Sequence, residues 1–197
     1  MKQYTLSLAL AGLFGLMLAP PARADAWNHK TKLDFTEPIE VPGKVLPAGH
    51  YIFKLMDSQS DRHIVQVWNA DETQIEGTFL TIPDKRLRAT GKTVIKFSER
   101  PSGSPEAMKA WFYPGARVGE EFVYPHDRAS ELARANREAV FSTRSDMSGY
   151  MTKSLNSDQD PDAMEMRKVV VMGVRPTGEE IEIIDIYQVP KSPRKEK

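Results

Sequence analysis

Apolar and polar residues alternate in short runs through the first two-thirds of the chain. Alternation with a period of two is typical of β-strands, because successive side chains point to opposite faces of a sheet. Pro, Gly and other turn-forming residues bound the runs, and helical periodicity is absent there. The predicted strands are residues 31–35, 39–41, 50–56, 62–69, 74–82, 93–97, 110–113 and 121–124. Their spacing predicts a mainly β fold, an antiparallel β-sandwich or barrel, over residues 25–125.

A hairpin is predicted around the polar turn at residues 57–61. A symmetric register centred on the middle of this turn places Tyr51 and Phe53 opposite valines on an almost wholly apolar face. The second face is mixed, and there His50 lies opposite Trp68. This pair is the one candidate binding element that the hairpin offers.

The pattern changes after residue 125. Residues 126–138 have a thin, Ala-rich apolar stripe at helical spacing, which predicts a surface helix. Residues 139–166 are polar and lack periodicity, so we expect a flexible linker. Two further apolar runs predict a β-hairpin over residues 167–190, followed by a disordered tail at 191–197. Such a hairpin is marginally stable alone, so we expect it to dock or pair.

The first 24 residues have the pattern of a secretory signal peptide. Lys2 is followed by an apolar run at residues 6–19, which is too short to span a membrane. Ala22-Arg23-Ala24 then gives the small-residue motif that signal peptidase recognises. We therefore expect an exported protein, in the periplasm or outside the cell, with no transmembrane segment after cleavage.

Charge and cysteine content exclude several functional classes. The chain has 27 basic and 27 acidic residues, and loss of Lys2 and Arg23 with the signal peptide leaves 25 basic ones. This near-neutral balance argues against attraction of the chain as a whole to nucleic acid or to an anionic membrane. The absence of cysteine excludes thiolate nucleophiles, disulfides and Cys-ligated metals.

Aromatic residues near the end of the β-rich region offer a candidate sugar-binding platform. Trp111, Tyr113 and Tyr124 are close in sequence, and exposed aromatic rings can stack on sugar rings. The alternative is that these rings pack in the core, which large aromatic side chains dominate. Packing is the favoured interpretation, because Phe112 makes both faces of that strand aromatic.

The remaining chemistry is sparse. The predicted register puts His50 and His63 on opposite faces, and the chain has neither an HxH nor an HExxH motif, so no metal site or cofactor is predicted. No nucleophile-elbow, Walker or dinucleotide motif is present. Methionines around the predicted linker offer a minor alternative, since thioethers bind Cu(I); they are Met147, Met151, Met164 and Met166.

Residues 27–53 contain two Pro-Gly-type turns and the motif "LPAG-x-Y", which leads into a strand. Together with "RPSGSPEAMKAWFYPG" at 100–115 and "EFVYP" at 121–125, this segment resembles a group of small exported bacterial β-rich proteins. The resemblance extends over about residues 27–135. It brings no catalytic residue with it.

These observations favour a non-enzymatic binding or structural module that acts through protein contacts in the periplasm or cell envelope. A carbohydrate-binding module is the first alternative, with a glycan stacked on exposed aromatic rings. A hydrolase without a recognisable motif is the second; it would require a cleft that gathers a histidine with two carboxylates.

Overall fold

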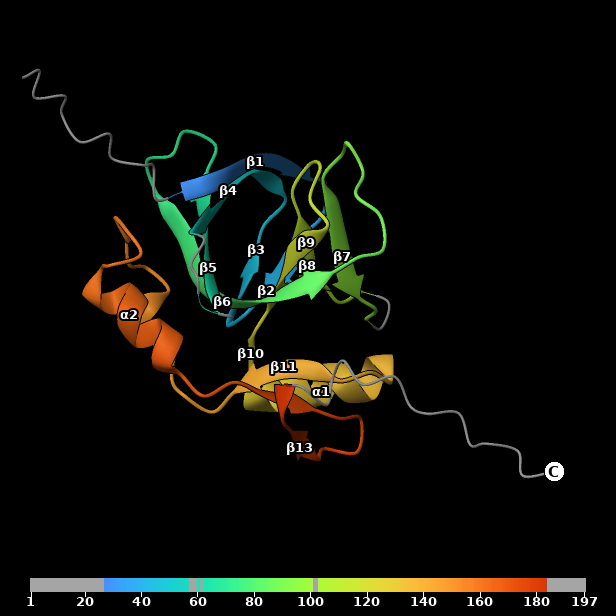
Figure 1. The fold of residues 1–197 in the computed structure, drawn as a ribbon. Helices are drawn as coiled ribbons and strands as arrows, with labels where there is room; N and C mark the ends of the chain where they lie inside the picture. The colour runs from blue at the N-terminus through green and yellow to red at the C-terminus, as the bar shows by residue number, and fades with distance from the viewer. Residues whose placement is uncertain (1–26, 57–59, 61, 101–102, 184–197) are drawn as a thin grey trace, which may run out of the picture.

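The protein is mainly β, as predicted, and its described residues form one large sheet, one small sheet and two α-helices (Figure 1). The computed structural model describes residues 27–56, 60, 62–100 and 103–183. The predicted signal peptide and the predicted disordered tail lie outside these residues.

The large sheet has nine strands. They are β1 (Trp27–Phe35), β2 (Ile39–Val41), β3 (Lys44–Leu46), β4 (Gly49–Met56), β5 (His63–Asn69), β6 (Ile75–Lys85), β7 (Val94–Ser98), β8 (Glu106–Phe112) and β9 (Val118–Phe122). The hydrogen-bonded order is β1-β4-β5-β6-β9-β8-β2-β3, and β7 pairs with β8. All of these pairs are antiparallel except β2 with β8.

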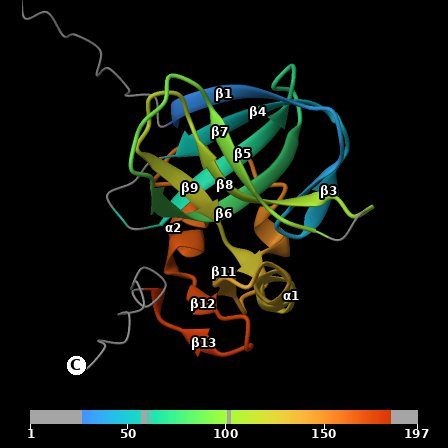
Figure 2. The same cartoon turned by 90° about the vertical axis from the view of Figure 1, so that its right-hand side faces the viewer.

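Aromatic contacts show that this sheet is strongly curled. β4 and β8 are four places apart in the strand order, yet the rings of Phe53 and Trp111 lie 5.6 Å apart. Similarly, Phe35 on β1 contacts Phe97 on β7 with ring centroids 6.5 Å apart. The inner face therefore encloses one apolar core. Figure 2 shows how the strands of the sheet curl round.

The β4–β5 hairpin has the predicted faces but a different register. Tyr51 pairs with Asn69 and Phe53 with Val67, two residues along β5 from the predicted partners. The predicted turn was too short, since Leu55 pairs with Val65 and not with His63. A shift of two residues keeps each side chain on its face because strand side chains alternate with a period of two. Tyr51 and Phe53 consequently still point into the core.

β6 continues past Pro83, where a strand end was expected. Pro83 pairs with Glu120 of β9, so the strand runs on through the proline to Lys85.

The second sheet is formed by β10 (Tyr124–Pro125), β11 (Val140–Thr143), β12 (Met172–Val174) and β13 (Glu180–Ile181), in that order. β12 and β13 are antiparallel, in accordance with the predicted C-terminal hairpin as far as Ile183. Within the residues that the structure describes, this hairpin pairs with β11 and not with the large sheet. The rest of the predicted hairpin, residues 184–190, lies outside the described residues.

The expected flexible linker at 139–166 was a wrong interpretation, because the region contains regular, buried structure. It includes β11, the 3-10 helix η1 (Ser148–Tyr150) and most of α2 (Pro161–Lys168). Asp160 caps α2, accepting a hydrogen bond from the Asp162 backbone N–H. Leu155 and Met166 pack against Ile64 and Leu80 on the outer face of the large sheet, in a second apolar core. The polar-looking segment is therefore the cover of that outer face.

The predicted surface helix is α1 (His126–Asn136), and its apolar face is fully buried. Ala129, Leu132 and Ala133 belong to the inner core, so α1 closes one end of the curled sheet. Neither α1 nor α2 is long and apolar enough to cross a membrane, and no other helix among the described residues is.

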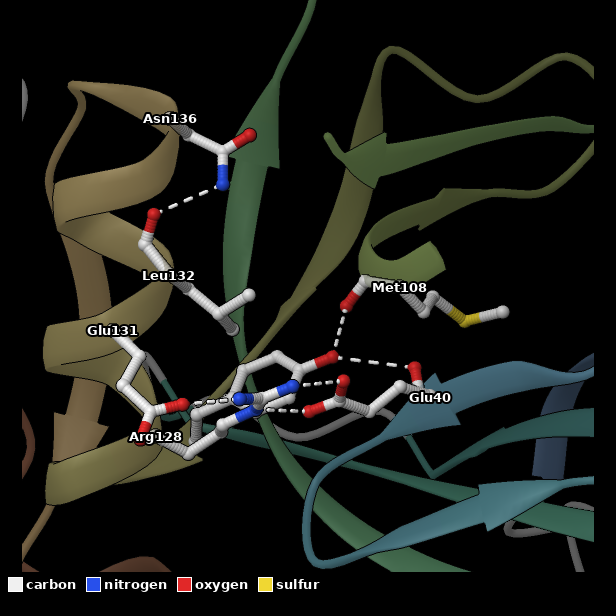
Figure 3. A network of polar contacts seen from close by, with 7 residues as sticks. Glu40, Met108, Arg128, Glu131, Leu132 and Asn136 are labelled. Carbon is white, nitrogen blue, oxygen red and sulfur yellow. Dashed lines mark hydrogen bonds and ion pairs between the residues drawn. The ribbon is translucent and has the colours of Figure 1, made fainter. Parts of the chain in front are cut away.

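An ion pair and a tyrosine anchor α1 to the large sheet (Figure 3). The Arg128 guanidinium donates two hydrogen bonds to the Glu40 carboxylate on β2 and a third to Glu131. The hydrogen bonds with Glu40 raise the pKa of Arg128. Tyr124, at the start of the segment that leads into α1, donates its hydroxyl to the Met108 carbonyl oxygen at 2.8 Å. These contacts fix how the second sheet sits beneath the first.

Replacing Arg128 with methionine is expected to lower the free energy of unfolding by about 2 kcal/mol. Methionine keeps the apolar stem but leaves the buried Glu40 carboxylate without its cation. Urea denaturation would measure the loss. Arg134→Met is the control, because Arg134 is exposed on the same helix and forms no salt bridge within the described residues. Equal stabilities of the two variants would contradict the anchoring role.

Candidate functional site

The aromatic residues considered as a sugar platform lie in the core. Trp111 is 0% exposed and contacts Phe53, and Tyr124 is also buried. Tyr113 is half-buried and stacks on the His29 ring with centroids 3.6 Å apart. Stacking on a sugar needs an open ring face, which neither Trp111 nor Tyr124 has. The packing interpretation therefore holds for these two rings.

His50 and Trp68 do not face each other, contrary to the predicted hairpin register. Trp68 lies opposite Ile52. Its ring lies under the Lys54 ammonium group, 4.6 Å from the ring centroid. His50 pairs instead with Asp34 on the neighbouring strand β1, and both side chains are exposed. The two-residue register shift separates the pair, so it does not form a binding element.

A buried polar cluster lies on the inner face of the large sheet. His63 Nδ1 is 2.9 Å from Glu120 Oε1, and the Thr81 hydroxyl donates to Glu120 Oε2 at 2.8 Å. Glu120 thus accepts hydrogen bonds from both neighbours, which offset the cost of burying a carboxylate. The Thr81 hydroxyl is bonded to Glu120 and not to His63, and Thr81 is fully buried. A substrate cannot reach this hydroxyl, so the cluster stabilises the fold and offers no accessible nucleophile.

Glu121, the next residue, points to the opposite face, as strand alternation requires. It is 7% exposed, and burial raises its pKa to about 7. The two nearby ammonium groups already have carboxylate partners, since Lys109 pairs with Glu138 at 2.7 Å and Lys96 with Asp84 at 2.8 Å. Glu121 itself forms no salt bridge to another described residue. It is therefore substantially protonated near neutral pH.

A mainly apolar pocket lies where the two sheets meet. It has a volume of about 190 Å³, and we call it the Met pocket. Its apolar wall is formed by β6, by the β2–β3 turn, by β10 with the residue before it, and by the residues on either side of η1. The apolar residues lining it are Pro42, Phe79, Leu80, Val123, Pro125, Met147 and Met151. Ser145, Asp146 and Ser148 form a polar rim on one side.

Backbone contacts hold the η1 side of the Met pocket against β6. The Thr78 N–H donates to the Met151 carbonyl oxygen at 3.0 Å. The Lys153 carbonyl oxygen accepts from the Thr78 hydroxyl at 2.8 Å and from the Gln66 side-chain amide at 2.7 Å. The wall that carries Met147 and Met151 is therefore fixed to the large sheet at two points.

The Pro42-Gly43 turn forms the opposite wall. Gly43 has φ +79°, the left-handed conformation that favours glycine. A Cβ atom at this position would lie 3.1 Å from the Met151 sulfur. Gly43 is consequently needed both for the turn and for close approach to Met151, a second role that the sequence did not reveal.

The Met pocket has one charged side chain at its rim. Asp146 at the rim is exposed, and hydrogen bonds from Ser148 lower its pKa, so it is a carboxylate near neutral pH.

Of the four methionines considered for copper, only Met147 and Met151 line the pocket, whereas Met166 is buried in the outer core and Met164 is exposed. No group of three or more His, Asp or Glu side chains suited to a metal ion occurs in the described part of the chain.

No protein-family model, curated protein or solved structure matches this chain. The resemblance to small exported bacterial β-rich proteins therefore stays a prediction from the quoted motifs.

Proposed function

We propose that the chain is an exported, non-enzymatic binding module that receives an apolar side chain of a protein partner in the Met pocket. The pocket volume carries this proposal. Typical small-molecule sites have volumes of about 300–1,000 Å³, and the Met pocket, at about 190 Å³, is smaller. It is large enough for one or two side chains presented by another protein.

The lining of the pocket supports the same conclusion. Methionine side chains are unbranched and polarizable, so Met147 and Met151 can adjust to different apolar shapes. The Asp146 carboxylate at the rim would orient the bound partner segment, since it favours a hydrogen-bond donor or a cation beside the inserted side chain. Binding of this kind requires no reacting group.

The proposed place of action is the periplasm or cell envelope. The signal-peptide pattern of residues 1–24 supports export. The absence of cysteine fits a domain whose stability comes from packing, and two apolar cores supply that stability. A glycan partner has less support, because Trp111 and Tyr124 are buried.

Site-specific photo-crosslinking in producing cells tests this function. A photoreactive residue at Ser145 or at Ser148 on the rim is expected to give the same discrete protein adduct. Met147→Asp should reduce this adduct about tenfold or more, because a charge in an apolar pocket is costly to bury. Met164→Asp is the matched control, since Met164 is an exposed methionine outside the pocket.

Three outcomes would contradict the proposal. The first is a lack of adduct at both rim positions. The second is the same adduct from a photoreactive residue at Val170, which is exposed and outside the Met pocket. The third is a protein found only in the cytoplasm with residues 1–24 still attached, which would contradict export.

A further inference from the structure

The loop between β6 and β7 exposes a leucine near its start. Leu87 is 94% exposed, although a leucine side chain gains about 1.5–3 kcal/mol when fully buried. Arg86 and Arg88 flank it in the sequence. Figure 1 and Figure 2 show this loop beside the β8–β9 loop, at the end of the large sheet away from α1.

Hydrogen bonds and a cation–π contact hold the loop in place. The Arg86 backbone N–H donates to the Arg117 carbonyl oxygen at 2.9 Å, and Arg86 Nε donates to the Ala116 carbonyl oxygen at 2.8 Å. The Arg86 guanidinium also lies 4.9 Å from the centroid of the Phe112 ring. Leu87 is therefore displayed by an anchored loop.

The surroundings of Leu87 are basic. Lys85, Arg88, Lys92 and Arg117 are exposed, and none of them forms a salt bridge to another residue that the structure describes. We call these four residues together with Leu87 the basic tip. Asp84, which precedes Lys85 on β6, is already paired with Lys96 at 2.8 Å. The whole chain has no net charge, so this positive charge is local.

We propose that the basic tip docks the protein on an anionic lipid membrane, with Leu87 inserted at the headgroup–acyl boundary and the four cations next to lipid phosphates. An exposed apolar side chain accompanied by exposed cations combines hydrophobic insertion with attraction to anionic lipid. Each basic side chain near an anionic membrane strengthens binding about fivefold. A lipid surface deforms around a protruding side chain, whereas an acidic protein partner would need a complementary pocket for Leu87.

This proposal is independent of the Met pocket. Phe79, Leu80 and the β2–β3 turn line that pocket at the junction of the two sheets, and no residue of the basic tip lines it. One molecule can therefore use both surfaces at once, with the tip on the membrane and the pocket on a protein partner.

Vesicle binding tests the proposal. The purified protein should co-sediment with vesicles of equal parts phosphatidylglycerol and phosphatidylcholine, but not with phosphatidylcholine vesicles. Added salt should weaken this binding, because the attraction is electrostatic. Leu87→Ser and Arg88→Glu should each reduce the affinity about tenfold. Val170→Ser is the matched control, because Val170 is exposed on the segment after α2, and it should leave the affinity unchanged.

Insertion of residue 87 has a direct readout because the chain contains no cysteine. Leu87→Cys labelled with an environment-sensitive fluorophore should shift to the blue on anionic vesicles, whereas labelled Val170→Cys should not shift. Equal binding to both kinds of vesicle, or full affinity in Leu87→Ser, would overturn the proposal. Binding to polyglutamate without binding to vesicles would also overturn it and would indicate an acidic protein partner.

Discussion

Replacing Glu121 with glutamine is expected to raise the free energy of unfolding by about 3 kcal/mol at about pH 8 and to leave it nearly unchanged at about pH 4. Glu121 is buried on the outer face of β9, and burial raises its pKa from the usual 4.5 to about 7. Glutamine has the shape of the protonated carboxyl group and does not titrate.

The direction of the pH dependence follows from proton binding. The folded protein binds a proton at Glu121 more tightly than the unfolded chain does. The resulting stabilisation is fully present below about pH 4.5, the unfolded pKa, and is lost as the pH rises through about 7, the folded pKa. The native protein should therefore lose about 3 kcal/mol over this window through Glu121 alone, since one pKa unit corresponds to about 1.4 kcal/mol.

Urea denaturation of the native protein and the variant across this pH range measures the effect. The quantity of interest is the difference between the two free energies of unfolding, because other titrating groups cancel in it. Glu99→Gln is the control, since Glu99 is an exposed glutamate just after β7. A difference that stays constant with pH would show that Glu121 titrates as an ordinary carboxyl group.

Strand alternation made the large sheet predictable from the sequence. Tyr51 and Phe53 occupy the predicted apolar face, and the β4–β5 hairpin forms where expected. The register was wrong because alternation fixes the face of a residue but not its partner. A turn longer by two residues gives the same pattern of faces. The predicted His50 and Trp68 pair depended on register, and it failed for that reason.

The cover of the outer face was not predictable in the same way. Its apolar residues, such as Leu155 and Met166, are separated by polar residues at irregular spacing, so no periodicity indicated burial. Gln66 and Thr78 on the sheet bind the Lys153 carbonyl oxygen, a contact between segments far apart in the chain. A single sequence contains no signal for such a contact.

The Met pocket shows the same limit. Pro42, Leu80 and Met147 come from three distant parts of the chain and meet only in the folded protein. Two local signals were visible, namely the Pro42-Gly43 turn and the methionines at 147 and 151. The turn was interpreted as architecture and the methionines as a linker feature or copper ligands. The fold joins them into one site, because the left-handed Gly43 leaves room for Met151.

Replacing Gly119 with alanine is expected to lower the free energy of unfolding by about 3 kcal/mol, the upper end of the range for overpacking a core. A Cβ atom at position 119 would lie 2.4 Å from Cδ1 and 2.6 Å from Cγ of Phe112 on the neighbouring strand. The ring cannot swing aside cheaply. Its Cγ atom is close to the backbone, Phe112 is fully buried, and the Arg86 and Lys96 cations lie 4.9 and 4.8 Å from the ring centroid. Displacement would also weaken both cation–π contacts.

The midpoint and slope of urea denaturation would measure this loss, and a double-mutant cycle would assign its cause. Phe112→Leu in the Gly119→Ala background should cost less than Phe112→Leu alone, because the smaller side chain removes the collision. Gly91→Ala is the control, since a Cβ atom there has no atom within 4 Å. Additive effects at positions 112 and 119 would mean that the ring and the glycine do not interact, and that Gly119 is needed for another reason.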